Sequence, residues 1–99
     1  MTEVPKSLSI RPITILGMEL IEWKVESCTA HFAVGPDWAT LYSIESEEPG
    51  KGHATMLMTI AKKYYEKQSK EVGGTVALNE VMAHLYEKLG YIEYKEDSP

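Results

Sequence analysis

The sequence predicts a single α/β domain of the α+β type, with a mixed, mostly antiparallel sheet and two main helices. The chain has 99 residues, which is enough for one hydrophobic core and leaves little room for a second. Its first half consists of short runs rich in β-branched and aromatic residues, separated by turn signals. Its second half places apolar residues at helical spacing. We expect one domain over residues 1–99, with frayed ends at 1–7 and 95–99.

Four short strands are expected in the first half, joined as an antiparallel meander. They span residues 9–16, 18–25, 28–34 and 38–46. Apolar residues alternate with others along the third strand, and this alternation predicts that Cys28 lies in the core. One face of the fourth strand is expected to carry every second residue: Trp38, Thr40, Tyr42 and Ile44.

The pattern changes period in the second half. Apolar residues at i, i+3, i+4 and i+7 predict an amphipathic helix over residues 53–70, ended by Gly73-Gly74. A short apolar strand is expected over 75–78. Asn79 can cap a second helix, which Gly90 ends, with Tyr91 folding back on its last turn. A final strand is expected over 92–95.

The composition restricts the classes of partner. The formal net charge is −5, which disfavours nucleic acid and favours a basic partner such as an amine. There is no run of about 20 apolar residues and no signal-peptide core at the N-terminus, so no membrane partner is expected. With one cysteine, the chain is expected to work in the reducing cytoplasm.

Residues 49–54, Pro-Gly-Lys-Gly-His-Ala, lie between an expected strand and an amphipathic helix. A helix N-terminus binds anions through its free N–H groups, and glycines allow a phosphate to approach closely. A plain strand-to-helix turn explains the spacing equally well. Two nucleotide motifs are excluded, because Glu45 stands where a P-loop needs glycine and Ala54 does not complete a dinucleotide fingerprint.

With this loop and a second motif downstream, the chain resembles the GNAT superfamily of acyl-CoA-dependent N-acyltransferases. The loop pattern of that family is Gln/Arg-x-x-Gly-x-Gly/Ala, and Gly52 and Ala54 match its last two fixed positions. Family members often read Asn, then seven residues later Tyr-Glu-Lys-Leu-Gly-Phe or a close relative. Here Asn79 is followed by residues 86–91, Tyr-Glu-Lys-Leu-Gly-Tyr. The resemblance covers residues 38–94 and implies a minimal form, short at its N-terminus.

The resemblance implies that acetyl-CoA is the acyl donor and assigns roles by position. The Tyr86 hydroxyl would protonate the leaving thiolate. Asn79 would contact the cofactor arm. The backbone of the fourth strand would pair with pantetheine at Tyr42, Ser43 and Ile44. Backbone amides would hold the pyrophosphate at Gly50, Lys51, Gly52, His53, Ala54 and Thr55.

The implied reaction is the direct transfer of an acetyl group from acetyl-CoA to a primary amine, on a small molecule or on a protein lysine or N-terminus. Glu45 is a candidate general base, with a solvated loop carboxylate as the other interpretation and water as the alternative that deprotonates the amine. Tyr86 can equally be a core tyrosine, and His53 a solvent-facing residue at the helix start. Three histidines and one cysteine without ligand spacing predict no metal site.

Two features depart from the family pattern. Pro49 stands at the Gln/Arg position and offers no N–H, and Glu45, Glu47 and Glu48 add negative charge beside the same loop. Gly17 leads directly into the next strand, where the family places one or two helices that cover the substrate. A catalytically degenerate binding or interaction module is therefore the alternative function, and a homodimer formed through exposed strand edges is a further expectation.

Overall fold

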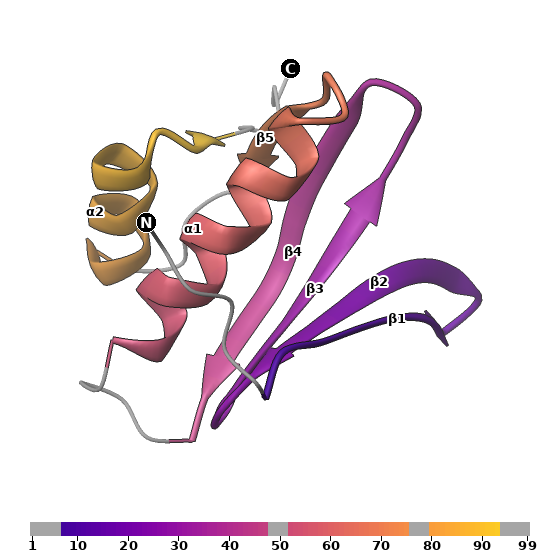
Figure 1. Cartoon of the computed structure of the whole chain (residues 1–99), viewed down its shortest axis with the longest axis horizontal. Helices are drawn as coiled ribbons and strands as arrows, with labels where there is room; N and C mark the ends of the chain where they lie inside the picture. The colour runs from indigo at the N-terminus through magenta and orange to yellow at the C-terminus, as the bar shows by residue number, and fades with distance from the viewer. Residues whose placement is uncertain (1–6, 48–51, 76–79, 94–99) are drawn as a thin grey trace, which may run out of the picture.

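A computed structural model describes residues 7–47, 52–75 and 80–93 of the chain. One six-stranded sheet runs in chain order from β1 to β6, and Figure 1 shows α1 lying across it with α2 beside α1. Strands β1 to β4 pair antiparallel, whereas β4–β5 and β5–β6 are parallel. The elements are β1 (Ser9–Ile15), β2 (Met18–Val25), β3 (Cys28–Val34), β4 (Trp38–Ser46), α1 (His53–Glu66), β5 (Glu71–Gly74), α2 (Glu80–Leu89) and β6 (Ile92–Glu93). The predicted α+β class with a mixed sheet and two helices is confirmed.

Both helices lie on one face of the sheet. Each connects two neighbouring parallel strands, and both connections step in the same direction across the sheet. Since such crossovers are right-handed, α1 and α2 must cover the same face, and they contact each other there. None of the described residues belongs to a helix on the other face, which we call the open face.

The β1–β2 hairpin projects away from the two helices (Figure 1). Its loop is the two-residue pair Leu16-Gly17, and both residues have positive φ, as a type I′ turn requires. Leu16 was expected to end the first strand and instead forms this turn. Residues 1–7 were expected to be frayed, and of these only Ser7 is described. Its hydroxyl oxygen accepts a hydrogen bond from the Glu26 N–H at 3.2 Å.

Strand β4 contains a bulge at Tyr42. Phe32 pairs with Leu41 and the preceding His31 pairs with Ser43, so Tyr42 is the extra residue. The bulge reverses the alternation that follows it. The expected common face for Trp38, Thr40, Tyr42 and Ile44 is therefore wrong, because Ile44 packs against the core while Tyr42 is exposed.

Helix α1 ends earlier than predicted. Ser69 takes a positive φ, and the Lys70 N–H donates to the Tyr65 carbonyl at 3.1 Å, which closes the helix as a Schellman motif. Gly73 and Gly74, expected to end the helix, instead lie in β5, which pairs with β4 four residues ahead of the predicted strand. The rest of that predicted strand (76–78), the Asn79 cap, residues 48–51 and the ends 1–6 and 94–99 lie outside the described residues.

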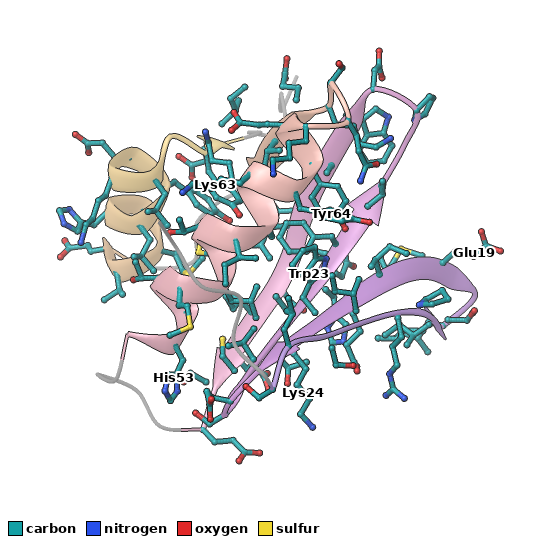
Figure 2. All side chains as sticks on the ribbon, viewed as in Figure 1. Glu19, Trp23, Lys24, His53, Lys63 and Tyr64 are labelled. Atoms are coloured by element: carbon teal, nitrogen blue, oxygen red, sulfur yellow. The ribbon has the colours of Figure 1, made fainter. Side chains whose placement is uncertain are left out.

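The core lies between the sheet and α1. Trp23 is fully buried and donates its indole N–H to the Tyr65 hydroxyl at 2.9 Å. Figure 2 labels Trp23 and the exposed Tyr64 near each other. Their ring centroids lie 5.3 Å apart. Cys28 is fully buried as predicted, and burial raises the pKa of its thiol to about 11. Within the described parts of the chain, neither helix is long and apolar enough to cross a membrane.

Candidate functional site

The candidate site lies where β4 and β5 stop pairing. The register between these parallel strands runs from Trp38 opposite Glu71 to Leu41 opposite Gly74, and the Thr75 N–H still donates to the Leu41 carbonyl at 3.1 Å. Within the described residues, β4 then continues without this neighbour through Tyr42, Ser43 and Ile44. The bulge at Tyr42 bends the strand at the same place. None of the described residues on the β5 side pairs with β4 along this stretch, and a strand edge of this kind can pair with another extended chain.

Helix α1 starts on the side of the molecule where β4 ends, and the backbone N–H groups of its first turn have no acceptor within the helix. Gly52 adopts φ +78° at the N-cap, and space is open around it, because an added Cβ would meet nothing within 4 Å. The amides of His53, Ala54 and Thr55 belong to the first turn, which has no intrahelical acceptors. The first turn carries no acidic side chain. The predicted contacts at Gly50 and Lys51 lie outside the described residues.

His53 is held on the side of the β2–β3 turn. Its Nδ1 lies 3.0 Å from the Ser27 hydroxyl, and Figure 2 shows the ring at the start of α1. The histidine is therefore anchored to the protein by one ring nitrogen. Ala54 packs partly against the core, and Thr55 uses its carbonyl to accept from the Thr59 hydroxyl at 2.7 Å. The backbone N–H groups of these residues are suited to an anion.

Tyr86 brings its hydroxyl to the end of the β4–β5 ladder. A Cβ built on Gly74 would lie 2.4 Å from that hydroxyl oxygen, so the ring rests directly on the β5 backbone. Burial raises the pKa of Tyr86, and the negative charge of Glu93 raises it further. A hydrogen bond with Thr75 acts in the opposite direction but does not cancel the increase. Its hydroxyl is therefore a neutral donor at physiological pH, at the point where the two strands stop pairing.

Tyr86 is fixed by the end of its own helix. Gly90 has φ +77°, and the Tyr91 N–H donates to the Tyr86 carbonyl at 2.9 Å, so α2 ends in the predicted fold-back. The two rings stack with centroids 6.0 Å apart. The Tyr91 hydroxyl in turn donates to the Met58 carbonyl of α1 at 2.5 Å. The position of the Tyr86 hydroxyl thus depends on packing between both helices.

The other predicted site residues divide into two groups. Glu45 is exposed on the open face, opposite Thr29 of β3. Gly74 pairs with Leu41, whose side chain is buried in the core on the helix-covered face. Tyr86 occupies the position that a Cβ on Gly74 would take, so it lies on that same face. Glu45 and Tyr86 therefore lie on opposite faces of the sheet. Asn79 lies outside the described residues.

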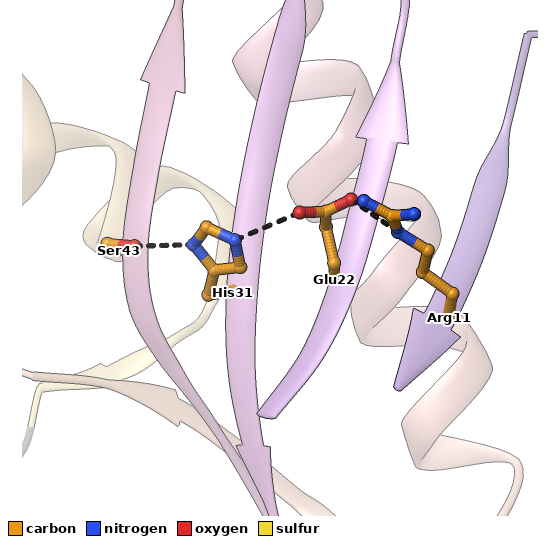
Figure 3. A network of polar contacts seen from close by, with 4 residues as sticks. All are labelled: Arg11, Glu22, His31 and Ser43. Carbon is orange, nitrogen blue, oxygen red and sulfur yellow. Dashed lines mark hydrogen bonds and ion pairs between the residues drawn. The ribbon is translucent and has the colours of Figure 1, made fainter. Parts of the chain in front are cut away.

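Sequence reasoning missed a polar network that crosses four strands on the open face (Figure 3). Arg11 Nε donates to Glu22 Oε1 at 2.9 Å, and the other Glu22 oxygen lies 3.3 Å from His31 Nε2. His31 Nδ1 lies 3.1 Å from the Ser43 hydroxyl. Alternation alone would place Ser43 on the core face with Ala39 and Leu41, and the bulge moves it to the open face. Only the strand register, including the β4 bulge, brings the four together.

Glu22 carries the negative charge of this network. Burial acts to raise the pKa of Glu22, but hydrogen bonds from Arg11 and His31 outweigh it and hold the pKa below its ordinary value of 4.5. Because the folded pKa is depressed, the charge stabilises the fold above pH 4.5, and this contribution is lost as pH falls through the folded pKa.

Glu22→Gln is therefore expected to lower stability at neutral pH by roughly 1 kcal/mol. Urea denaturation of both proteins between pH 3 and 7 measures the difference, which should shrink below pH 4.5. Glu19→Gln is the matched control, because Glu19 is an exposed residue of the same strand. A difference between wild type and Glu22→Gln that grows toward low pH contradicts the expectation.

The described residues contain no group of three or more histidine, cysteine or acidic side chains that could hold a metal ion. In comparisons with protein-family models, curated proteins and solved structures, no match was found.

Proposed function

We propose that this protein is a small acyltransferase of the GNAT type that moves an acetyl group from acetyl-CoA to a primary amine. The observation that carries the proposal is the neutral Tyr86 hydroxyl resting on Gly74, where the β4–β5 ladder ends. The bulged edge of β4 and the first turn of α1 both precede that position in the sequence and follow one another along the chain. The mixed sheet with a β4–α1–β5 parallel crossover is compatible with this fold family.

The described residues fit the proposed donor. The open space at Gly52 and the first-turn amides of α1 suit a pyrophosphate. The β4 edge from Tyr42 to Ile44 suits an extended pantetheine arm, whose amides would pair as a strand does. When bound, acetyl-CoA supplies an activated acetyl thioester.

The role that we propose for Tyr86 is to donate a hydrogen bond to the departing sulfur. A tyrosine with a raised pKa is a weaker acid than an ordinary thiol, whose pKa is about 8.5. Complete proton transfer from Tyr86 is therefore uphill, and the main contribution is a fixed donor aimed at developing negative charge. The donor acts in a buried place, where such a hydrogen bond is stronger than in water.

Titration calorimetry with acetyl-CoA tests the cofactor assignment, with saturable binding expected at or below about 1 mM. A matched pair of variants at Gly52 localises the pyrophosphate. Asp and Asn both tolerate the left-handed conformation there, and both have room. Gly52→Asp should bind acetyl-CoA about tenfold more weakly than Gly52→Asn, because only aspartate repels the phosphates.

Two results oppose the proposal. Absence of acetyl-CoA binding at millimolar concentration overturns both the cofactor and the reaction. Binding without release of free CoA thiol in the presence of small amines or lysine peptides overturns the reaction alone. The second result favours the degenerate binding module. The sequence arguments for that module are Pro49, which stands at the Gln/Arg position of the family pattern, and the neighbouring acidic residues.

A further inference from the structure

The side chains of the open-face network are joined so that they can accept a proton from a bound molecule. Ser43, His31 and Glu22 follow one another on β4, β3 and β2, and Arg11 on β1 completes the row (Figure 3). The side chains of His31 and Glu22 are 20% and 15% exposed, so both are largely shielded, whereas Ser43 is exposed. A molecule that approaches this face meets the serine hydroxyl first.

The carboxylate decides how the hydrogen atoms are arranged. Glu22 is ionised at neutral pH and only accepts, so His31 must carry its hydrogen on Nε2, which faces Glu22. In the neutral imidazole this leaves Nδ1 as an acceptor. The Ser43 hydroxyl, 3.1 Å away, therefore donates to Nδ1. The lone pairs of the serine oxygen remain available to a hydrogen-bond donor above the sheet.

This arrangement lies across the sheet from Tyr86. Ser43 follows the bulged Tyr42 on the β4 edge, two residues after Leu41. Leu41 is level with Gly74, on which Tyr86 rests from the helix-covered face. An extended molecule on the β4 edge would thus have a neutral hydroxyl donor on one face and a histidine-backed hydroxyl on the other.

We propose that His31, acting through the Ser43 hydroxyl, is the general base that accepts the proton of the acceptor amine, and that this amine enters on the open face of the sheet. The inference rests on the proposed acetyl-CoA-dependent function and assigns the base that sequence reasoning left open between Glu45 and solvent. Glu22 positions the imidazole and stabilises the imidazolium that forms. Arg11 holds Glu22.

The transfer balances with these groups. The amine nitrogen forms a C–N bond to the acetyl carbon while the C–S bond to CoA breaks and its electron pair stays on sulfur. The nitrogen gives one proton to the Ser43 oxygen, whose own proton passes to His31 Nδ1. The thiolate accepts a hydrogen bond from Tyr86. Solvent then takes the proton from His31 and supplies one to the thiolate, so the products are the N-acetyl amine and free CoA.

The charged groups around His31 balance one another. Within the described residues, β2 contributes Glu22 and Lys24 to the open face, β1 contributes Arg11 and β4 contributes Glu45. Arg11 pairs with Glu22, and Lys24 and Glu45 flank Thr29 on its two sides. With two charges of each sign, this face suits an amine that reacts in its neutral form and gives up a single proton.

The test compares His31→Gln, Ser43→Ala and Ser43→Thr with the wild type for acetyl-CoA affinity and for the kcat and KM of the amine. Acetyl-CoA affinity should be unchanged in all three variants. His31→Gln and Ser43→Ala should lower kcat/KM on the order of 10²-fold, mainly through kcat. Ser43→Thr should keep kcat/KM near the wild-type value, because threonine retains the hydroxyl.

Two outcomes separate this inference from the proposed function. If His31→Gln and Ser43→Ala keep the wild-type rate while acetyl transfer proceeds, the base assignment is wrong and the function stands. The same holds if Glu45→Gln, and neither of the others, lowers kcat/KM on the order of 10²-fold. If the wild type itself transfers no acetyl group, both proposals fail together. Thermal melts of every variant show whether a rate loss has another cause.

Discussion

Replacing Tyr86 with phenylalanine is expected to lower the turnover of acetyl transfer on the order of 10²-fold, with little change in acetyl-CoA affinity. Phenylalanine keeps the ring that stacks on Tyr91 and rests on Gly74, so the packing of α2 is retained. Only the hydroxyl is removed. If that hydroxyl donates to the departing sulfur, its loss affects the transition state more than the bound donor.

Release of CoA thiol measures the turnover, and calorimetry measures the affinity. Tyr91→Phe is the matched control, because it removes a hydroxyl from the ring stacked on Tyr86. The Tyr91 hydroxyl donates to the Met58 carbonyl, so its removal should cost about 1 kcal/mol of stability and leave turnover intact. Equal turnover in Tyr86→Phe and the wild type removes Tyr86 from the mechanism. An equal loss in both variants assigns the effect to packing.

Local signals in the sequence predicted most of the elements of the fold. The strands β2, β3 and β4 have the bounds that turn residues and alternation predicted. The end of α2 at Gly90, with Tyr91 folded back, follows from the preference of glycine for positive φ. Each of these features depends on contacts between residues that are close in the chain. For the same reason, Tyr86 could be placed on its helix from the apolar spacing alone.

What sequence reasoning missed depends on contacts between distant residues. No pattern marks Tyr42 as a bulge, because the register with β3 decides which residue is extra. Without the bulge, Ser43 would face the core and would not lie beside His31. The sequence alone therefore does not predict the open-face network. Ser69 is a further example, since serine rarely adopts positive φ. The residues that follow it make distant contacts: Lys70 Nζ donates to the Gly35 carbonyl at 2.6 Å and the Glu71 N–H donates to the Asp37 carbonyl at 2.9 Å.

The Tyr86 ring leaves no room for a side chain at Gly74 of β5, so replacing Gly74 with alanine has a large expected effect. Gly74 is not among the glycines with positive φ, so alanine fits its backbone, and in an ordinary strand this exchange stabilises by roughly 0.5–1 kcal/mol. Here the new Cβ would lie 2.4 Å from the Tyr86 hydroxyl oxygen and 2.5 Å from its ring. Gly74→Ala should therefore destabilise the protein by about 1–3 kcal/mol, because the ring must move out of a packed site.

A double-mutant cycle with Tyr86→Leu isolates this contact. Leucine has no atoms where the phenol ring meets Gly74, so Gly74→Ala should cost less in that background, with a coupling energy of about 1–3 kcal/mol measured by urea denaturation. The same displacement should carry the hydroxyl away from the end of the β4–β5 ladder, so Gly74→Ala should also lose turnover while it still binds acetyl-CoA. An equal cost in both backgrounds, or a stabilised single variant, contradicts the contact. Retained turnover in Gly74→Ala contradicts the role of a fixed Tyr86 hydroxyl, because the ring cannot keep its place beside the new Cβ.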